Sequence, residues 1–433
     1  MDKLKNLKLY GVPFPLFAFL AAVVLITGYT GVMPVELIGA IATLFTLGII
    51  MGEIGDRLPI WNKYCGGGAI LAFILSSLFT YYGVFPKPFL DNINGWMKTY
   101  SFLNVFIILL IVGSILGINR KMLIRSFGLY IPVILAGVVT SAVLGCLAGS
   151  LFGLSPKMVI ASFVLPIMGG GAGAGAIPLA QIYGEISGQD PSSYLAFALA
   201  ILAIGNILSV AFAVVMDVVG RLRPGWTGNG ELMRDASRDA AEEKDAKIDV
   251  TIHEIGAALF MCAGFFMFAT LVSKKILPTI FGTPIHAFAY LIIFVVLANA
   301  FNIIPADLKA GAQRLQVFCG SKLMWIMMVA SSTALVDFSE ILKVMSLPNF
   351  VIAFAVVLGG VLGSAFFGWL VGFYPVESAL TAGLCMSNMG GAGDLAVLGA
   401  AKRMNLMSYA QISSRIGGAI ILLIGSFFFG LTQ

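Results

Sequence analysis

Long apolar segments recur along the whole chain, and they constrain its fold more than any other feature. A membrane-crossing α-helix needs about 20 predominantly apolar residues, and segments of about that length recur from residue 13 to residue 430. Apolar residues make up 59% of the chain and charged residues only 11%, a composition unlike that of soluble domains. The sequence therefore predicts an all-α polytopic membrane protein and excludes an ordinary soluble enzyme.

Eleven of these segments are predicted to be transmembrane helices. They lie at 13–33, 35–52, 65–84, 101–118, 128–154, 193–217, 254–273, 285–304, 320–336, 348–373 and 408–430. Two further apolar segments, 157–184 and 376–401, are interrupted by glycine runs, and we expect each to form a reentrant hairpin of two half-helices. The first span is followed by others without an evident small-residue cleavage site, so a cleaved signal peptide is not predicted.

The distribution of positive charge predicts the orientation of these segments. With the N-terminus in the cytoplasm, 19 of the 26 Lys and Arg residues fall inside, six fall outside and one, Arg415, falls within a span. This bias follows the positive-inside rule and places the C-terminus outside. Because the basic residues border the spans, the net charge of +5 does not indicate a nucleic-acid partner.

The chain contains a weak internal repeat. Moving the second half back by about 219 positions aligns Pro305 with Pro86, and the glycine runs beginning at Gly170 and Gly390 then coincide as the same tetrad, GGAG. Each half holds five crossings and one hairpin, and because five is odd the halves have inverted topology, as in many secondary transporters. The predicted organisation is a tail and extra helix (1–34), a first repeat (35–217), a cytoplasmic linker (218–253) and a second repeat (254–433).

The two glycine-rich tips have the composition of a binding site. In hydrocarbon a broken helix persists only where its free backbone groups find partners. The N–H groups that begin one half-helix attract a carboxylate, whereas carbonyls that end the other half suit a small hard cation such as sodium. Inverted topology lets the tips meet near the membrane midplane. The alternative is that the glycines only permit close helix packing.

Arg415 lies about two turns into the last predicted helix, in SYAQISSRIGGA. A cation is costly there unless it finds a partner, and its planar guanidinium can bind a carboxylate through two hydrogen bonds. Alternatively it pairs with Glu377 or Asp394, or extends to the cytoplasmic edge. These two acids flank the second hairpin, where they either carry a coupled proton or cap the ends of half-helices.

Other polar and sulfur-bearing residues have plain alternatives. Ser413, Ser414 and Asn388 place hydroxyl and amide groups beside Arg415 and the second tip, or else make ordinary interhelical hydrogen bonds. His253 and His286 sit at span ends, with no relay between them. The five cysteines, at positions 65, 146, 262, 319 and 385, are interpreted as buried apolar residues rather than metal or disulfide sites.

The segments LPIMGGGAGAGAIPLAQIY and GLCMSNMGGAGDLAVLGAAKRMNLMSYAQISSRIGGA together resemble the 2-hydroxycarboxylate transporter family of bacteria, the citrate and malate symporters. The likeness covers nearly the whole chain and includes NKYCGGG, the INRKML loop and YPVESALTAGLCM. The resemblance implies a homodimer in the bacterial cytoplasmic (inner) membrane that moves substrate by an elevator-like motion. It implies sodium coupling in many members, and proton coupling or exchange in others.

The resemblance also implies roles for individual residues. Arg415 is expected to hold a substrate carboxylate, together with tip amides. The expected substrate-binding residues are Arg415, Gly171, Ala172, Gly173, Asn388, Gly390, Gly391 and Ser413. The expected sodium-binding residues are Ile167, Gly170, Cys385, Met386, Asn388 and Ser414, with Cys385 and Met386 contributing carbonyls. No cofactor is expected, and Na+ is the coupling ion.

Three positions depart from the pattern of citrate carriers in that family. Ala172 stands where they usually have Asn, Met389 where they have Arg, and Ala392 where they have Ser. Loss of the second arginine removes the partner for a third carboxylate, since a buried unpaired carboxylate is heavily penalised. The prediction is sodium-coupled symport of a 2-hydroxy-dicarboxylate, malate most simply. The alternatives are a citrate or proton-coupled symporter or exchanger, and a passive anion channel. No enzymatic motif is found.

Overall fold

The computed structural model describes residues 7–432 apart from 65–66, 119–127, 235–249, 281–282, 285, 336–337 and 339–343. The described chain is helical except for two short antiparallel hairpins, β1–β2 and β3–β4. Cys65, part of the INRKML loop and the middle of the predicted linker lie outside the described residues. The chain divides into two compact units, which are described separately: unit 1 comprises 1–106 and 320–342, and unit 2 comprises 107–319 and 343–433.

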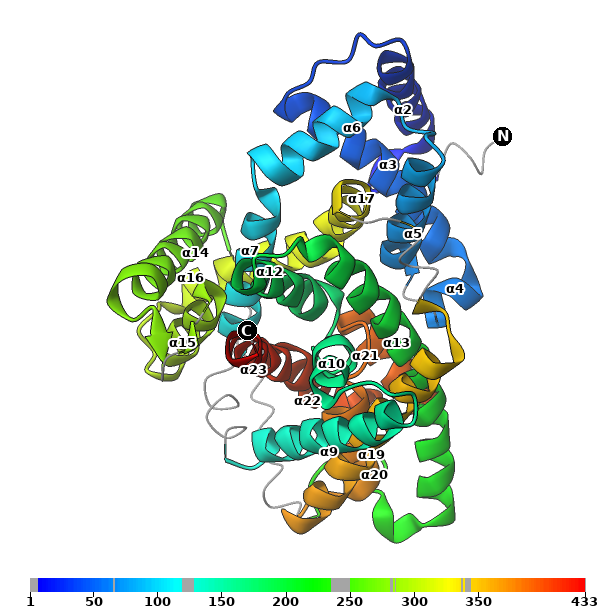
Figure 1. The fold of residues 1–433 in the computed structure, drawn as a ribbon, viewed down its shortest axis with the longest axis vertical. Coiled ribbons are helices and arrows are strands. Elements are labelled where there is room, and N and C mark those ends of the chain that lie inside the picture. The colour runs from blue at the N-terminus through cyan, green and yellow to red at the C-terminus, as the bar shows by residue number, and fades with distance from the viewer. Residues whose placement is uncertain are drawn as a thin grey trace. The chain divides into compact units, whose positions relative to one another are not determined.

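Unit 1 contains the N-terminal elements and one later helix (Figure 1). They are β1 (Lys8–Leu9), β2 (Val12–Pro13), α2 (Phe14–Tyr29), α3 (Leu37–Arg57), α4 (Pro59–Tyr64), α5 (Gly67–Tyr81), α6 (Lys87–Asn94), the π-helical η1 (Gly95–Thr99) and α17 (Met324–Leu335). Two elements cross the boundary between the units: α7 (Phe102–Leu116) and η7 (Cys319–Leu323).

Unit 2 contains the remaining elements. They are α9 (Tyr130–Ser150), α10 (Pro156–Val159), η2 (Ile160–Val164), α11 (Leu165–Ile167), η3 (Ala172–Ala176), α12 (Ile177–Ser187), α13 (Pro191–Leu222), η4 (Pro224–Trp226), α14 (Ile252–Leu271), η6 (Val272–Ile276), β3 (Thr279–Ile280), β4 (Thr283–Pro284), α15 (Ala287–Ala300), α16 (Ala306–Phe318), α19 (Leu347–Leu370), α20 (Pro375–Ser378), η8 (Ala379–Leu384), α21 (Gly391–Ala400), η9 (Met404–Leu406), α22 (Met407–Ile412), η10 (Ser413–Gly417) and α23 (Gly418–Leu431).

Seven helices in the described residues are long and apolar enough to cross a membrane, or eight if the bent pair of α6–η1 and α7 counts as one span. Every predicted span coincides with a helix, but α2, α5 and α15 are shorter than a full crossing. The fold class is therefore as predicted, a polytopic all-α protein. Eleven crossings and two inverted repeats remain predictions.

Several predicted boundaries are wrong. The span expected at 320–336 is the end of a longer helix, Ala306–Ala334, that begins directly after Pro305. A second unpredicted helix, α6, begins directly after Pro86. Both prolines are N-cap residues with the extended backbone usual at that position, with ψ of 153° at Pro86 and 150° at Pro305. The two prolines that align in the repeat thus start two corresponding helices, which are too polar to be identified from hydropathy.

The core of unit 1 is formed where α3, α5 and α17 pack closely. The hydroxyls of Ser76 and Ser332 lie 2.7 Å apart, joining α5 to α17. A Cβ on Gly48 would lie 3.2 Å from the backbone of Ile326, so α3 and α17 approach through that glycine. Small residues at such crossings allow polar contacts between helices in an apolar medium.

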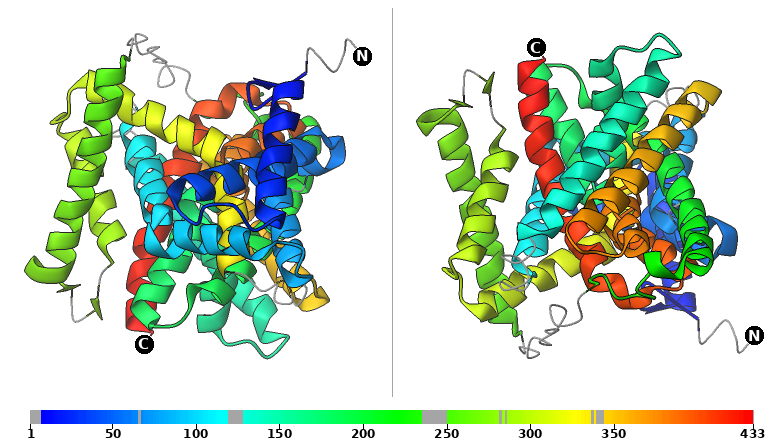
Figure 2. Two further views of the ribbon diagram at one scale, coloured as in Figure 1. Left: turned by 90° about the horizontal axis from the view of Figure 1, so that it is seen from above. Right: turned by 90° about the horizontal axis from the view of Figure 1, so that it is seen from below.

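In unit 2, α9 and α19 lie side by side (Figure 2). Thr140 donates its hydroxyl to the carbonyl of Gly359 at 2.7 Å, and Ser141 donates to that of Val356 at 2.8 Å. Gly359 and Gly363 leave no room for a Cβ against α9. This close crossing supports the half-helices that follow each of the two helices in sequence.

Part of the predicted linker packs against the start of the second hairpin. The helix α13 continues to Leu222, beyond its predicted end at 217. The chain then returns: the N–H of Tyr374 donates to Leu232 (2.9 Å), and that of Arg234 donates to Gly372 (3.0 Å). Residues 227–234 are therefore part of the base of the second hairpin. The amphipathic helix considered for the middle of the linker lies outside the described residues.

Candidate functional site

The first glycine run breaks a helix into two halves, as predicted. One half comprises α10, η2 and α11, and the other comprises η3 and α12. Gly170 and Gly171 between them have φ of 72° and 125°, conformations that residues with a Cβ rarely adopt. The chain doubles back so tightly that a Cβ on Gly175 would collide with the carbonyl of Gly169. Glycine is thus required at this tip by backbone conformation and by proximity.

The second run produces a similar break. One half comprises α20 and η8, the other is α21, and Gly390 between them has φ of 79°. The N–H of Asp394 donates to the carbonyl of Gly390 at 2.8 Å, which closes the first turn of α21. Gly391 is exposed, and a Cβ placed on it meets nothing within 4 Å. Open space therefore adjoins the N-terminus of this half-helix.

The two tips touch each other through backbone atoms. The N–H of Gly170 donates to the carbonyl of Met386 at 3.1 Å, and a Cβ on Gly171 would lie 3.0 Å from the backbone of Gly390. A Cβ on Gly170 would collide with the carbonyl of Ser414 in η10. We call this meeting of Gly170, Gly171, Gly390 and Ser414 the tip crossing.

Side-chain oxygens gather beside the tip crossing. Asp394 is fully buried; one carboxylate oxygen accepts the amide of Asn388 at 3.0 Å, and the other accepts the hydroxyl of Ser414 at 3.0 Å. The amide oxygen of Asn388 accepts the N–H of Gly390 at 2.7 Å. Two of the residues expected to bind sodium, Asn388 and Ser414, are therefore hydrogen-bonded to the same carboxylate, that of Asp394.

Arg415 follows Ser414 in the same π-helical turn, and π-helical turns are frequent at functional sites. The described residues offer its guanidinium no hydrogen bond and no carboxylate within 4.0 Å. Its electrostatic attraction is to Asp394. A short-range salt bridge of Arg415 with Glu377 or Asp394, considered from sequence, is absent among the described residues.

Glu377 instead anchors the base of the second hairpin. It is fully buried and accepts four donors: the hydroxyl of Thr227 (2.6 Å), the N–H groups of Gly228 (3.1 Å) and Gly230 (3.2 Å), and Nε of Arg403 (3.3 Å). Arg403 also lies 3.4 Å from the carboxylate of Asp217, at the end of α13. Glu377 thus binds the 227–230 loop and an arginine, rather than capping the end of a half-helix as considered from sequence.

Sequence reasoning missed three polar residues around the tips. Asn206 accepts the N–H of Met389 at 3.0 Å, and the hydroxyl of Ser209 lies 2.9 Å from that of Ser387. Both lie within the apolar run of α13, where a buried amide or hydroxyl was the available signal. Tyr130, on α9, shares a 2.8 Å hydrogen bond with Ser413. The hydroxyl of Ser413 is therefore engaged with α9.

The other expected residues lie at half-helix ends. Ala172 and Gly173 begin η3, and Gly391 begins α21, so their N–H groups fall in first turns, which leave such groups without intrahelical partners. Ile167 ends α11 and Cys385 follows η8, where carbonyls are left in the same way. The carbonyl of Met386 is already used by Gly170. The structure thus brings together Gly170, Gly171, Met386, Asn388, Gly390 and Ser414.

Histidine takes no part in this arrangement, whereas the buried thiol of Cys385 shares a hydrogen bond with the carboxylate of Asp394. The cysteines in the described residues are free, and those residues hold no cluster of three or more His, Cys, Asp or Glu side chains that could hold a metal ion. His286 caps α15 by accepting the N–H of Phe288, and its Nε2 lies 3.0 Å from Glu185. His253 lies in the first turn of α14.

The arrangement can bind an anion and a cation side by side. Two half-helix N-termini offer positive potential to a carboxylate, and so does the guanidinium of Arg415, for which the described part of the chain holds no short-range partner. Backbone carbonyls and the oxygens of Asn388, Asp394 and Ser414 are the hard ligands that a small cation prefers. The two sets meet at the tip crossing, so each bound ion would favour binding of the other.

The chain is similar to known proteins over almost its full length. The profile of the 2-hydroxycarboxylate transporter family matches residues 9–427. The citrate/sodium symporter of Salmonella typhimurium is 44% identical over 428 residues, 99% of this chain and 96% of that protein. The citrate/sodium symporter of Klebsiella pneumoniae is 44% identical over 431 residues, covering 100% and 96%. The Na(+)-malate symporter of Bacillus subtilis is 34% identical over 410 residues, covering 94% and 89%.

Proposed function

The chain belongs to the 2-hydroxycarboxylate transporter family, and we propose that it is a sodium-coupled symporter of a 2-hydroxycarboxylate. Membership makes it a multi-pass membrane transporter rather than an enzyme. The tip crossing is the observation that carries the proposal, because it places anion-binding helix ends beside cation-binding oxygens. Citrate is the first candidate substrate and malate the second.

Sodium is proposed as the coupling ion on two grounds. The relatives that are 44% identical are named citrate/sodium symporters, and the one at 34% is a Na(+)-malate symporter. The oxygens around Asp394 are of the chemical type that sodium prefers. Binding of sodium there would also offset the negative charge of Asp394, so a substrate carboxylate could approach Arg415 without repulsion.

The choice of substrate rests on two observations that point in different directions. Whole-chain similarity favours citrate, since the citrate/sodium symporters named above are more similar to this chain than the malate symporter. This weakens the malate preference inferred from sequence. A specific feature keeps malate as the second candidate: position 389 at the second tip is Met, so Arg415 is the one cationic side chain that the sequence supplies among tip residues 167–173 and 385–394 and the SSRIGG segment.

The wider arrangement is proposed from family likeness. We expect a homodimer in the bacterial cytoplasmic membrane, with the N-terminus inside and the C-terminus outside. Alternating access of an elevator type would carry the tip crossing as one piece. The backbone contacts between Gly170, Gly171 and Gly390 support this, because tips joined in that way move together.

Uptake into proteoliposomes tests the function. Labelled citrate and labelled malate are compared under an inward sodium gradient, an inward proton gradient and neither. We expect uptake that depends on the sodium gradient, with citrate preferred. Uptake driven by protons alone would overturn the proposed coupling, and absence of uptake of either acid under every gradient would overturn the proposed function.

Two variants assign the site. Arg415→Ala should lower uptake at least about 30-fold, because loss of one partner of a buried charged pair costs about 2–5 kcal/mol, while the purified protein keeps its size-exclusion profile. Lys87→Ala, at an exposed position in unit 1, is the matched control.

Met389→Arg should raise the ratio of citrate to malate uptake. An unchanged ratio would show that residue 389 does not select the substrate.

A further inference from the structure

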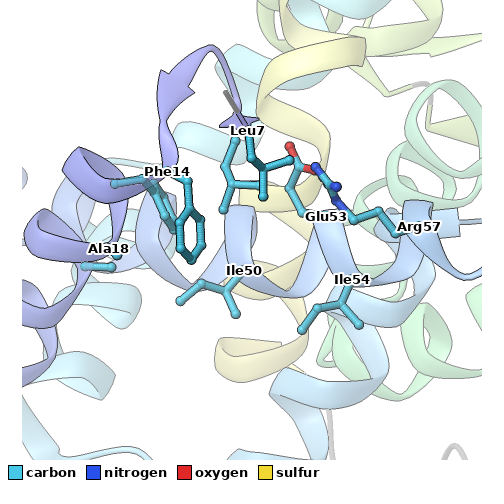
Figure 3. A pocket seen from close by; sticks show the side chains of 10 residues that line it. Leu7, Phe14, Ala18, Ile50, Glu53, Ile54 and Arg57 are labelled. Carbon is cyan, nitrogen blue, oxygen red and sulfur yellow. The ribbon is translucent and has the colours of Figure 1, made fainter. Parts of the chain in front are cut away.

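An apolar cavity of about 390 Å³ lies in unit 1, between the N-terminal hairpin, α2 and α3 (Figure 3). Phe14 and Ala18 border it from α2, and Ile50 and Ile54 border it from α3. Glu53 and Arg57, also from α3, lie together at its polar end, beside Leu7. The cavity belongs to neither the tips nor the charged base of the second hairpin.

A second apolar cavity continues from the first. It has about 260 Å³ and shares Ile50 and Ile54 with the first cavity. It extends to Leu25 and Tyr29 at the end of α2, so the two cavities together follow α2 from its first residue to its last. We call them the α2–α3 groove.

Only one side of α2 packs against the rest of unit 1. In α2 only Phe17, Ala21 and Gly28 are buried, whereas Phe19 is 64% exposed and Ile26 is 62% exposed. In a membrane-spanning protein the medium around such a helix is lipid, and lipid-facing gaps between helices are filled by acyl chains rather than water. The shape and apolar lining of the groove suit an extended chain of that kind.

The polar end of the groove carries net positive charge. The carboxylate of Glu53 is occupied, since it accepts the N–H of Tyr10 at 3.1 Å and both Nε and Nη2 of Arg57, at 3.0 and 2.8 Å. Arg57 is held in place by this pair while its side chain stays 51% exposed. Lys322 lies 4.7 Å above the ring of Tyr10. Lys8 is in the same hairpin but alternates with Leu7 and Leu9, which line the cavity, and so faces away from it. Two cations, Arg57 and Lys322, thus stand against the one carboxylate of Glu53.

We propose that the α2–α3 groove binds an anionic glycerophospholipid, with one acyl chain along α3 and the phosphate at Arg57 and Lys322. The acyl chain alone gives little selectivity, because the surrounding bilayer is equally apolar. The basic side chains supply it, since cationic residues at a membrane surface attract anionic lipids. Arg57 adds directed donors that match phosphate oxygens.

Native mass spectrometry of the full-length protein in detergent tests the site. The protein is titrated with phosphatidylglycerol and with phosphatidylethanolamine of the same acyl chains. We expect one phosphatidylglycerol per chain to bind about tenfold more tightly than phosphatidylethanolamine. Equal affinity for the two lipids would overturn the proposal, as it would indicate non-selective lipid around the protein or an occupant of another kind.

Variants locate the bound lipid. Ala18→Trp fills the groove and should weaken binding of phosphatidylglycerol about tenfold. Val23→Trp, on the opposite face of α2 and not part of either cavity, should leave binding unchanged. Ala18→Leu is a milder filling for the case in which Trp prevents folding, and it should weaken binding in the same direction. Unchanged binding of phosphatidylglycerol in a folded Ala18 variant would contradict the proposed position of the acyl chain in the groove.

The head group is tested separately. Arg57→Gln should lower the preference for phosphatidylglycerol about fivefold while binding of phosphatidylethanolamine stays the same. Arg57→Lys should restore part of the preference, and Lys87→Gln, a cation elsewhere in unit 1, should change nothing. A preference that survives Arg57→Gln in full would refute the role of Arg57. Transport assays are not needed, so this result is independent of the proposed symport.

Discussion

The two glycine tips have similar backbones and different side chains. The first tip, Gly169 to Gly173, has only glycine and alanine, so it contacts its surroundings through N–H and carbonyl groups. The second tip has Ser387, Asn388 and Asp394, which are all buried and hydrogen-bonded. The first tip is therefore fixed by close backbone contact, and the second by a network of side chains.

This difference separates two tasks within one site. Backbone amides bind any carboxylate in the right position, and they cannot be changed by substitution. Side-chain oxygens can be exchanged one at a time, so ion preference can be altered at the second tip without moving the first. We expect substitutions at the first tip to affect structure, and those at the second to affect affinity.

The largest effect is expected for Gly170→Ala. The change forces a Cβ into a residue with φ of 72° and into the carbonyl of Ser414. Left-handed conformation costs about 1–2 kcal/mol and overpacking about 1–3 kcal/mol, so uptake in proteoliposomes should be abolished. Gly399→Ala, in the half-helix α21 and outside the site, is the matched control: its Cβ meets nothing within 4 Å, and the protein should fold and transport normally. Equal uptake by the two variants would contradict the comparison.

Glu377→Gln tests the base of the second hairpin. The variant leaves Arg403 buried with a weaker partner, and we expect a loss of about 2–3 kcal/mol in the free energy of unfolding. Glu231→Gln, on the same segment but exposed, should change it by less than about 0.5 kcal/mol. Thermal unfolding of both proteins in one detergent provides the measurement. Similar melting temperatures for the Glu377→Gln and Glu231→Gln variants would show that the buried charges do not stabilise the fold.

Asp394→Asn tests the side-chain network of the second tip. Asparagine keeps the size of the side chain but removes one of the two acceptors that hold Asn388 and Ser414. The sodium concentration for half-maximal uptake should rise about tenfold, or about 1.4 kcal/mol. Asp91→Asn, at an exposed position of α6, should leave it unchanged. An unaltered sodium dependence in Asp394→Asn would remove Asp394 from the proposed ion site.

The smallest effect is expected at Glu185, on the first hairpin and outside the candidate spans. Contact with His286 holds the pKa of Glu185 below its ordinary 4.5. The pKa of Glu185 is thus lower in the folded protein than in the unfolded chain. Its ionised carboxylate therefore stabilises the fold at neutral pH, and this stabilisation is lost as pH falls through the lowered pKa. Because Glu185 is 56% exposed, its interaction with His286 contributes less than about 1 kcal/mol to the free energy of unfolding.

Glu185→Gln should therefore lower the melting temperature slightly at pH 7, and the difference from the unmodified protein should vanish well below pH 4.5. A difference that grows toward acid pH would contradict the sign of this argument. A large difference at pH 7 would show that the first hairpin, like the second, depends on a charged anchor.

The helical class and the broken helices were predictable because each depends on local composition. Runs of apolar residues specify helices in a membrane, and five glycines among seven residues, as at 169–175, specify a break. The helices α6 and α16 were missed because they are too polar for hydropathy to identify them. The proline before each one was the local signal that was available.

The site was predictable only in part. The glycines, Asn388 and Ser414 were identified, and the structure brings them together. The ion pair of Arg403 with Asp217 and Glu377 was not identified from sequence, because it joins residues that are far apart in the chain. In the sequence, each of the three looks like an ordinary charged residue at the end of a span. Family likeness supplied residue roles that composition and spacing cannot give, and it does not fix the preferred acid.

The tip crossing also has a consequence for synthesis of the protein in the cell. The N–H of Gly170 is bound by the carbonyl of Met386, and Gly170 packs against Ser414; both residues come more than 200 positions later in the chain. At ribosomal rates of about 5–20 residues per second, the first tip must wait for ten seconds or longer with backbone groups unpaired at membrane depth. The nascent first hairpin should therefore be a substrate for membrane chaperones, and a chain that ends before α22 should be degraded rather than partly active.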